Sequence, residues 1–472
     1  MSSLSGALGP PLTTGRRRSL PEAAATVVGA VSLLGLVSLS LLVVLIASER
    51  PSFLTPTSRP GLFPAWMVGP LRGLWPGLTR NPTRLEWLVS GLLGAMYVLY
   101  LAALATAPRV RAGWMLAAVL AIHVIFLLAP PLSYTDVFNY VNYGRMAAAH
   151  HLNPYVALPA SEPHSDPSYA LSNWHHLRSP YGPLFTLLTY ALVPLGVKGS
   201  FWALKLIVAA ASLGLLALVW KCARLLGRSE VAAVTLVAFN PIVLVWGLGA
   251  DHNDALMVLF VVLAVYVALR GAWGRAGGAL LAAVFIKASA AVLLLVLFAA
   301  GSARRVLAGA LVAAAGLALA SIGAFGLHLP DLVTQSRLVT AIGIPNLVGL
   351  ALGQGGETAG LALAFGLLVA LTVVSCSIWV RRGGDWITGC GVTMFVVVVS
   401  LSWAAPWYVL WILPFAALSA GWRLRAAVLV LGAYFILAFM PAAATLARDA
   451  GFRPAETALG VRHSHAIAAA FR

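Results

Sequence analysis

The chain has 472 residues, of which 61% are hydrophobic and 10% are charged, and its formal net charge is +17. A soluble domain carries roughly 25% charged residues, so this composition excludes the soluble globular class and predicts a protein with several membrane spans. The arginines mostly punctuate apolar runs, which fits orientation by basic cytoplasmic loops and argues against a nucleic-acid partner. The three cysteines show no C-x-x-C spacing and predict no disulfide framework.

The N-terminal part predicts a cytoplasmic, disordered segment over residues 1–26, which is rich in Gly, Pro and Ser and has a basic cluster at Arg16, Arg17 and Arg18. The apolar run 27–47 predicts the first span, because a signal peptide has a shorter apolar core of about 7–15 residues.

Two further spans are predicted at residues 86–106 and 112–130, with Arg109 and Arg111 in the short loop between them. Basic loops stay in the cytoplasm, so the third span delivers Asp136 to the outer face. Residues 131–200 then predict an outer loop, in which the short, Pro-bounded run 182–197 is interpreted as an interfacial helix.

The C-terminal half predicts spans between further basic clusters, one of them kinked at Asn240–Pro241. Residues 276–300 lie between two basic pairs, so they predict a hairpin or re-entrant pair with Lys287 near its turn or deep in the membrane. The fold class is therefore an all-α integral membrane bundle of about 11–13 membrane segments over residues 27–441, followed by a polar tail at 442–472. The other spans are predicted at 202–225, 231–248, 255–270, 303–325, 358–380, 386–402, 405–420 and 424–441.

Asp136 is the first candidate for chemistry, since it follows an apolar run and precedes a polar segment. With Tyr140 and Tyr143 it falls at i, i+4 and i+7, which is one face of a helix if the segment is helical. The structural alternative is a helix N-cap. The functional interpretation is a general base that accepts a proton from an attacking hydroxyl, a role worth about 10²–10⁴ in rate.

A second polar group, Asp251, His252, Asn253 and Asp254, interrupts the apolar sequence before the span at 255–270. Helix capping would explain one aspartate but not four polar residues. A metal site is an alternative, although two carboxylates and one histidine in one loop are a weak signal. No metal or cofactor is expected.

Lys287 lies in the apolar run A-A-V-F-I-K-A-S-A-A-V-L. A lysine at the centre of a membrane span costs about 2.5–3.5 kcal/mol unless it snorkels or finds a partner. Snorkelling is one interpretation, and the other is a counter-charge for a lipid phosphate.

Further polar residues of the outer loops are candidates for binding phosphate or sugar hydroxyls. Three aromatic residues, Trp403, Trp407 and Tyr408, fit the aromatic belt of the membrane interface, with sugar stacking as the alternative. No Walker loop and no G-x-G-x-x-G after a strand are present, so the sequence contains no nucleotide cradle. The outer-loop candidates are His175, His176, Arg178, Tyr181 and Arg337.

Several of these motifs together resemble the polyprenol-phosphate-mannose-dependent α-1,6-mannosyltransferases of actinobacteria, which are GT-C membrane glycosyltransferases. The similar segments are S-Y-T-D-V-F-N-Y-V-N-Y-G-R, the N-P-Y at 153–155, S-P-Y-G-P-L at 179–184, G-A-D-H-N-D-A-L-M at 249–257, and Lys287.

This resemblance implies an inverting transfer of a sugar, mannose by analogy, from a polyprenyl-phosphate donor to a glycan or glycolipid, at the outer face of the plasma membrane. Asp136 would be the base, and Lys287, helped by Arg145 or Arg337, would hold the lipid phosphate. The Asp251–Asp254 group would line the same cavity, and Tyr140, Tyr143, Asn153 and Tyr155 are expected substrate contacts.

Two other classes remain open at this point. A transporter or flippase of lipid-linked sugars would place charged residues near the middle of several spans, whereas here most polar residues cluster at one face. A scaffold subunit of an envelope-building complex would not need Asp136.

Overall fold

The computed structural model describes residues 21–54, 63–132 and 136–471, and every regular element in these ranges is helical. Six segments of this described part are long and apolar enough to cross a membrane. The predicted class, an all-α membrane protein with several spans, is confirmed. The six are α1 (Glu22–Glu49), α4 (Pro82–Thr106) with η1 (Ala107–Arg109), α7 (Pro183–Leu192) continued by η3 (Val193–Leu195) and α8 (Gly196–Leu225), α13 (Ala303–Phe325), α16 (Ala359–Arg381) and α19 (Trp422–Phe439).

Shorter helices complete the bundle and its surface. The apolar ones are α5 (Ala112–Leu127), α10 (Asp254–Leu269), α11 (Trp273–Ile286), η5 (Ala288–Val292) with α12 (Leu293–Ala300), α17 (Trp386–Ser400), and η6 (Pro406–Trp411) with α18 (Leu413–Leu418). The others are α2 (Pro51–Leu54), α3 (Ala65–Val68), α6 (Asp136–His150), η2 (Pro159–Ser161), α9 (Glu230–Ala238), η4 (Val243–Leu248), α14 (Leu332–Ser336), α15 (Ile344–Ala351), α20 (Ala443–Asp449), η7 (Pro454–Glu456) and α21 (Ala458–Phe471).

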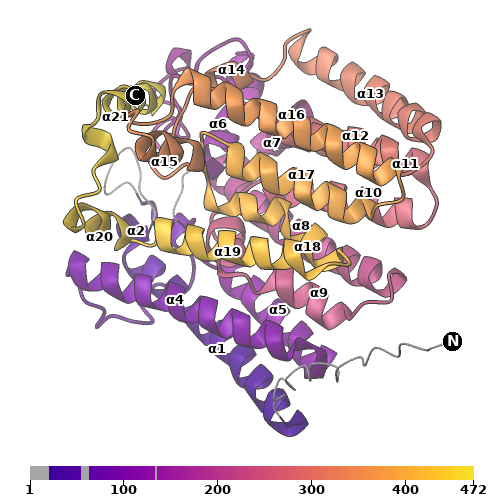
Figure 1. Cartoon of the computed structure of the whole chain (residues 1–472). Coiled ribbons are helices and arrows are strands. Elements are labelled where there is room, and N and C mark those ends of the chain that lie inside the picture. The colour runs from indigo at the N-terminus through magenta and orange to yellow at the C-terminus, as the bar shows by residue number, and fades with distance from the viewer. Residues whose placement is uncertain (1–20, 55–62, 133–135, 472) are drawn as a thin grey trace, which may run out of the picture.

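Figure 1 shows the long helices stacked in layers, with α1 against α4 and α16 against α17, and the short helices α15, α20 and α21 gathered at one end of the bundle. Helices α13 and α16 keep most of their apolar side chains exposed; Leu319, for example, is 73% exposed. Large exposed apolar faces of this kind are typical of contact with lipid.

Helices α11 and α12 form a hairpin whose turn carries Lys287. The two ends of the hairpin lie together. This is shown by Gly301, at which an added Cβ would lie 2.4 Å from the ring of Trp273. Lys287 has an extended backbone, φ −151° and ψ 121°, which ends α11. Of the two positions predicted for Lys287, the structure shows the one near the turn of the hairpin, and the depth of this hairpin in the membrane stays a prediction.

Close backbone packing holds this hairpin against α13. A Cβ on Gly277 would lie 2.1 Å from the carbonyl oxygen of Val306, and one on Gly309 would lie 1.8 Å from that of Gly274. Small residues permit this approach of two membrane helices. The position of Lys287 therefore depends on glycines far from it in the sequence.

We expect Gly309→Val to destabilise the protein by about 1–3 kcal/mol, because the added methyl groups must push α11 and α13 apart. Gly316→Val is the matched control, since it lies on the same helix with open space around its Cα. Thermal unfolding in detergent checks the prediction, and equal losses in the two variants would contradict it.

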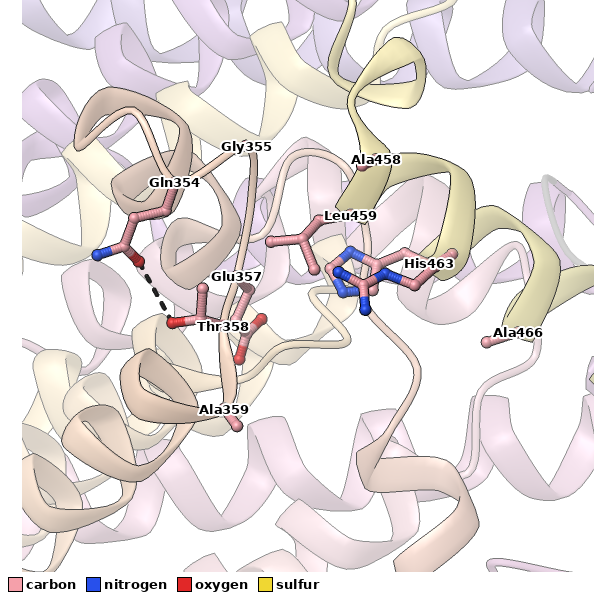
Figure 2. Close-up of a pocket in the computed structure, with 10 residues that line it drawn as sticks. Gln354, Gly355, Glu357, Thr358, Ala359, Ala458, Leu459, His463 and Ala466 are labelled. Carbon is pink, nitrogen blue, oxygen red and sulfur yellow. Dashed lines mark hydrogen bonds between the residues drawn. The ribbon is translucent and has the colours of Figure 1, made fainter.

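The C-terminal region 442–472, predicted as a polar tail, contains α20 and α21 and packs back on the molecule. The ring of Phe471 lies 4.9 Å from that of Trp174, and the N–H of His176 donates to the carbonyl of Ala470 at 3.1 Å. Figure 2 shows α21 beside the loop 354–359. Residues 1–20, including Arg16–Arg18, lie outside the described part, and α1 begins at Glu22, before the predicted span at 27–47.

Candidate active site

The first wall of the site is the beginning of α6. Asp136 opens this helix, and the side chains of Tyr140 and Tyr143 are buried with it, as expected for one helical face. The side-chain nitrogen of Asn139 lies 3.5 Å from Asp136 Oδ1. Tyr181 presents its ring at right angles to that of Tyr140, with centroids 4.8 Å apart. Tyr134, two residues before Asp136 in the sequence, lies outside the described residues.

The second wall is the loop between η4 and α10. Helix α9 ends before Asn240, whose side-chain oxygen accepts from the N–H of Ile242 at 3.0 Å, and the chain continues as the π-helical turn η4. The predicted break at Asn240–Pro241 is confirmed. The π-helical turn leads directly into residues 249–253, and such turns occur often at functional sites.

Asp251 turns this loop with a positive φ of 58°, a conformation that costs free energy for a residue other than glycine. Its carboxylate accepts from Lys205 Nζ at 3.1 Å, and the Lys205 side chain is fully buried in α8. This buried ion pair fixes the turn. The conformation of this loop directs His252, Asn253 and Asp254 toward the beginning of α6.

His252 connects the two walls. Its Nδ1 lies 3.5 Å from Asp136 Oδ2 and 3.4 Å from the hydroxyl of Tyr140, and its ring stacks on that of Trp407 with centroids 3.6 Å apart. Burial, followed by the charge of Lys287, lowers the pKa of His252 well below its usual value. The imidazole is therefore neutral near pH 7 and adds no positive charge beside Asp136.

Asp254 and Lys287 form the charged centre of the site. Lys287 Nζ donates to both carboxylate oxygens of Asp254, at 2.9 and 3.0 Å, and the indole of Trp411 donates to Asp254 Oδ1 at 2.5 Å. The ammonium also lies over the rings of Tyr408 and Trp411, 4.8 and 5.2 Å from their centroids. Lys287 thus has partners inside the protein, so its burial does not require snorkelling.

The aromatic-belt interpretation is also wrong for Trp407 and Tyr408. Both are buried, because the segment 406–411 folds into the turn η6 inside the bundle instead of lying at its surface. Trp403 packs edge-on against Trp174, with centroids 5.9 Å apart.

Asp136 has a carboxylate suited to accept a proton. Burial raises its pKa to about 6, while the nearby charge of Lys287 and hydrogen bonds from Asn139 and Trp174 oppose this rise. A base whose pKa lies slightly below the working pH is mostly ionised and still basic enough to take a proton.

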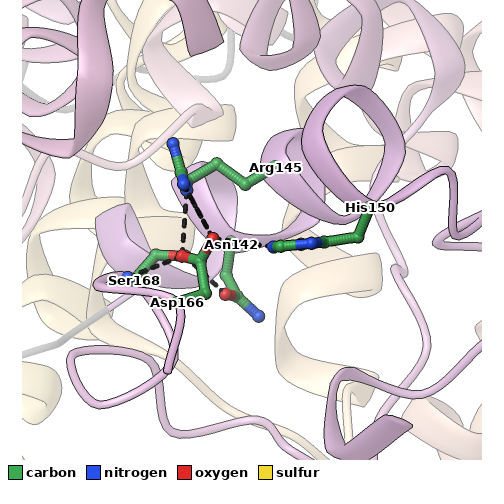
Figure 3. Close-up of polar contacts among 5 residues, drawn as sticks. All are labelled: Asn142, Arg145, His150, Asp166 and Ser168. Carbon is green, nitrogen blue, oxygen red and sulfur yellow. Dashed lines mark hydrogen bonds and ion pairs between the residues drawn. The ribbon is translucent and has the colours of Figure 1, made fainter. Parts of the chain in front are cut away.

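A separate polar network fastens the loop that follows α6 to that helix (Figure 3). Arg145 Nη2 and His150 Nε2 both lie 2.7 Å from Asp166 Oδ2, and the Ser168 hydroxyl joins Asp166 Oδ1 to the side chain of Asn142. Burial alone would raise the pKa of Asp166, but the bonds from Arg145 and Ser168 hold it far below its usual range. Arg145 is therefore already paired, nine residues or about 13 Å along α6 from Asp136.

Some of the remaining candidates form contacts that hold the loop between α6 and α7 in place. Asn153 donates to the carbonyl of Phe325 at 2.6 Å, and the hydroxyl of Tyr155 donates to the carbonyl of Tyr181 at 3.0 Å. His175 is buried and stacked on Tyr169, whereas the side chains of His176, Arg178 and Arg337 are exposed. The site proper therefore combines Asp136, Tyr140, Tyr181, Asp251, His252, Asn253, Asp254 and Lys287.

Sequence reasoning missed Lys205, Trp174 and Trp411. Lys205 carries the same signal as Lys287, a lysine within an apolar run, and the same insertion cost would have singled it out. The two tryptophans gave no such signal, because only the fold turns them toward carboxylates. Among the described residues, no group of three or more His, Cys, Asp or Glu side chains could hold a metal ion.

Two family models match the chain. The model described as "Alpha-(1->6)-mannopyranosyltransferase, N-terminal domain" matches residues 66–304, and the one described as "MptB C-terminal domain" matches residues 339–468. The first match includes Asp136, Lys205, the Asp251–Asp254 group and Lys287, and the second includes η6 and most of α21.

Curated relatives agree with the family models. The chain is 28% identical to a probable alpha-(1->6)-mannopyranosyltransferase of Mycolicibacterium smegmatis over 353 residues, which cover 62% of this chain and 63% of the relative. It is 27% identical to alpha-(1->6)-mannopyranosyltransferase A of Mycobacterium tuberculosis over 355 residues, or 67% of each chain. The B protein of Corynebacterium glutamicum is 25% identical over 62% of this chain and 56% of its own length. No solved structure is significantly similar.

Proposed function

Because the chain belongs to the alpha-(1->6)-mannopyranosyltransferase family, we propose that it transfers mannose from a polyprenyl-phosphate donor to a glycan or glycolipid acceptor, with inversion, at the outer face of the plasma membrane. The observation that carries this proposal is the buried carboxylate of Asp136, which lies within the electrostatic reach of the Lys287–Asp254 pair. The site therefore contains a base for the attacking hydroxyl and a cation for the departing phosphate.

In this mechanism Asp136 accepts the proton of the acceptor hydroxyl while that oxygen attacks the anomeric carbon of the donor. The bond between that carbon and the phosphate oxygen breaks, and the electron pair leaves with the lipid phosphate. One base suffices for a single displacement, in contrast to the two carboxylates of a glycosidase. His252 is neutral and stacks on Trp407. It fills the space beside Asp136 and forms no ion pair with that carboxylate.

Lys287 stabilises the departing phosphate. A compact ammonium on a flexible stem can turn from Asp254 toward a phosphate that arrives beside it. The two hydrogen bonds that Lys287 donates to Asp254 hold the ammonium in position. Positive charge aimed at a leaving group is a large contribution to catalysis in a site that excludes water.

An apolar groove of about 570 Å³ leads to the hairpin turn and would take the polyprenyl chain of the donor. Phe285 and Ala288, on either side of Lys287 in the sequence, line it together with α13 and the loop after α13. The N–H of Gly182 donates to the carbonyl of Ile286 at 3.0 Å, which ties the groove to the outer loop. A lipid tail in this groove would bring its phosphate toward the turn that carries Lys287.

Filling this groove should weaken binding of a long lipid donor. We expect Ser321→Trp, on the groove side of α13, to raise the KM for a long-chain polyprenyl-phosphate-mannose about tenfold or more, with little effect on a short-chain analogue. The control is Leu319→Trp, which lies on the exposed side of the same helix. Steady-state kinetics with the two donors checks this, and equal effects on both donors would contradict it.

The pH dependence of transfer should follow Asp136. Its pKa is raised to about 6, and the base must be ionised, so we expect kcat/KM to fall about tenfold per pH unit below pH 6 and to level off above pH 7. Initial rates from pH 4.5 to 8 check this. A profile that is flat across pH 6 would remove Asp136 as the base.

The proposal is tested by mannose transfer in membranes that contain the protein, given an α-1,6-mannan-type acceptor and either radiolabelled polyprenyl-phosphate-mannose or a nucleotide-linked mannose. We expect labelled product from the lipid donor alone. Transfer from the nucleotide sugar would contradict the donor assignment, and movement of the lipid donor across the membrane without transfer would favour a flippase.

A further inference from the structure

The ion pair of Lys205 with Asp251 is closed off inside the bundle. Lys205 Nζ donates to both carboxylate oxygens of Asp251, at 3.1 and 3.4 Å, and lies 5.7 Å from the centroid of the Phe201 ring. The Lys205 side chain is 0% exposed and that of Asp251 is 2% exposed. The side chains of Asp136 and Lys287, in contrast, remain 13% and 17% exposed. A substrate that reaches the second two therefore does not reach the buried pair.

The backbone at Asp251 adopts a conformation that glycine normally provides. Its φ is 58°, and it occupies the left-handed position of a Schellman motif. In this motif the N–H of His252 donates to the carbonyl of Gly247 at 3.2 Å, and the N–H of Asp251 donates to that of Leu248 at 3.4 Å. Glycine is the usual residue at this position, because a side chain adds strain there. The carboxylate that meets Lys205 explains why an aspartate is present instead.

The turn at Asp251 sets the positions of groups on both sides of the site. His252 follows it directly, and its ring lies 3.5 Å from the carboxylate of Asp136. Asp254 follows three residues later and accepts from Lys287 at 2.9 Å. A change of φ at Asp251 to the ordinary negative range would redirect the chain and move both of these contacts.

Stability alone does not explain the buried pair. Apolar side chains of similar volume can often replace a buried ion pair without loss of stability, so the pair is weak evidence for a stabilising role. A backbone conformation that costs free energy, in contrast, is commonly retained at active sites, where it forms part of the mechanism. Both considerations favour a role in the geometry of the reaction.

We propose that Lys205 and Asp251 are positioning residues for mannose transfer. Their ion pair imposes the left-handed turn, and the turn directs residues 252–254 toward Asp136 and Lys287. The Asp251 carboxylate contacts no substrate and acts through the backbone alone. This rests on the proposed function, to which it adds a buried pair that controls the geometry of the site from outside it.

Two double variants separate the turn from the carboxylate. Lys205→Met should lower kcat about 10²-fold, because the carboxylate of Asp251 can no longer be buried unpaired in this turn and the site geometry shifts with it. Lys205→Met/Asp251→Gly should recover kcat to within about threefold of the wild type, since glycine adopts a positive φ without strain. Lys205→Met/Asp251→Val should remain about 10²-fold low, because a β-branched residue disfavours a positive φ.

Neither double variant contains a buried unpaired charge, so both should fold, which thermal unfolding in detergent checks. The matched control is Lys198→Met, a change at an exposed lysine of the same helix, which should transfer mannose at the wild-type rate. Wild-type kcat in all the variants would show that the pair is only structural and would overturn the proposal. Equal losses in the two double variants would also overturn it, since they would make the Asp251 carboxylate a substrate contact.

Hydrogen exchange of residues 247–257, measured by mass spectrometry, reports the turn without any transfer. We expect faster exchange than in the wild type for Lys205→Met and for Lys205→Met/Asp251→Val, and wild-type exchange for Lys205→Met/Asp251→Gly. Unchanged exchange in all three would overturn control of the turn by Lys205. No mannose transfer by the wild type, with the expected exchange pattern intact, would overturn the proposed function and leave Lys205 as the residue that holds the turn.

Discussion

Asp136→Asn should reduce mannose transfer by about 10²–10⁴ while the protein remains folded and abundant. Asparagine has the size of aspartate, and its side-chain oxygen can still accept hydrogen bonds from Asn139 and Trp174. Its amide group, however, cannot accept the proton of the acceptor hydroxyl. Because burial of an ionised carboxylate costs free energy, the variant should unfold at the same or a higher temperature than the wild type.

The measurement is the initial rate with lipid-linked mannose at pH 7.5, beside Asp449→Asn as a control. Asp449 is an exposed carboxylate at the end of α20 and should tolerate the change. A scaffold subunit would show no effect of either substitution. Unchanged transfer by Asp136→Asn would show that another group takes the proton.

Lys287→Met should lower kcat by about 10²–10³, as expected when a charge that stabilises a leaving group is removed. It should also destabilise the protein by about 3–5 kcal/mol, because it leaves the buried carboxylate of Asp254 without its cation. The single variant therefore confounds two effects.

The double variant Lys287→Met/Asp254→Asn separates them. Replacing Asp254 by asparagine removes the uncompensated charge and should recover most of the stability lost by Lys287→Met. Mannose transfer should stay low, because no cation then stabilises the departing phosphate. Recovery of both stability and transfer in the double variant would show that Lys287 is only a structural counter-ion.

The sequence was most informative at the few polar residues that interrupt or directly follow apolar runs. Asp136, the Asp251–Asp254 group and Lys287 were each found because a polar residue in or beside a membrane span is expensive, and the structure brings all of them together. The hairpin at Lys287 was predicted because basic residues flank both of its ends, which indicates that both ends lie on the same side of the membrane.

Partners were harder to predict than positions. Nothing in the sequence pairs Arg145 with Asp166 or Lys205 with Asp251, since each pair joins segments whose approach depends on the complete fold. Trp407 and Tyr408 have the composition of an interfacial belt, and only the inward turn of η6 removes them from the lipid. The placement of 182–197 at the interface stays a prediction. In the structure α7 continues through a turn at Gly196, with φ 67°, into α8.

The hairpin of α11 and α12 also bears on how the chain enters the membrane during synthesis. Trp273 and Gly301 meet, so the two ends of the hairpin lie together, and a Cβ on Gly274 would lie 3.4 Å from the carbonyl oxygen of Arg305. Helix α12 has eight residues, far fewer than the roughly 20 that span a bilayer, so it cannot insert alone. We therefore expect the insertion machinery to admit both arms as one unit. A change in hairpin length would then leave the orientation of α13 and every later helix as it is.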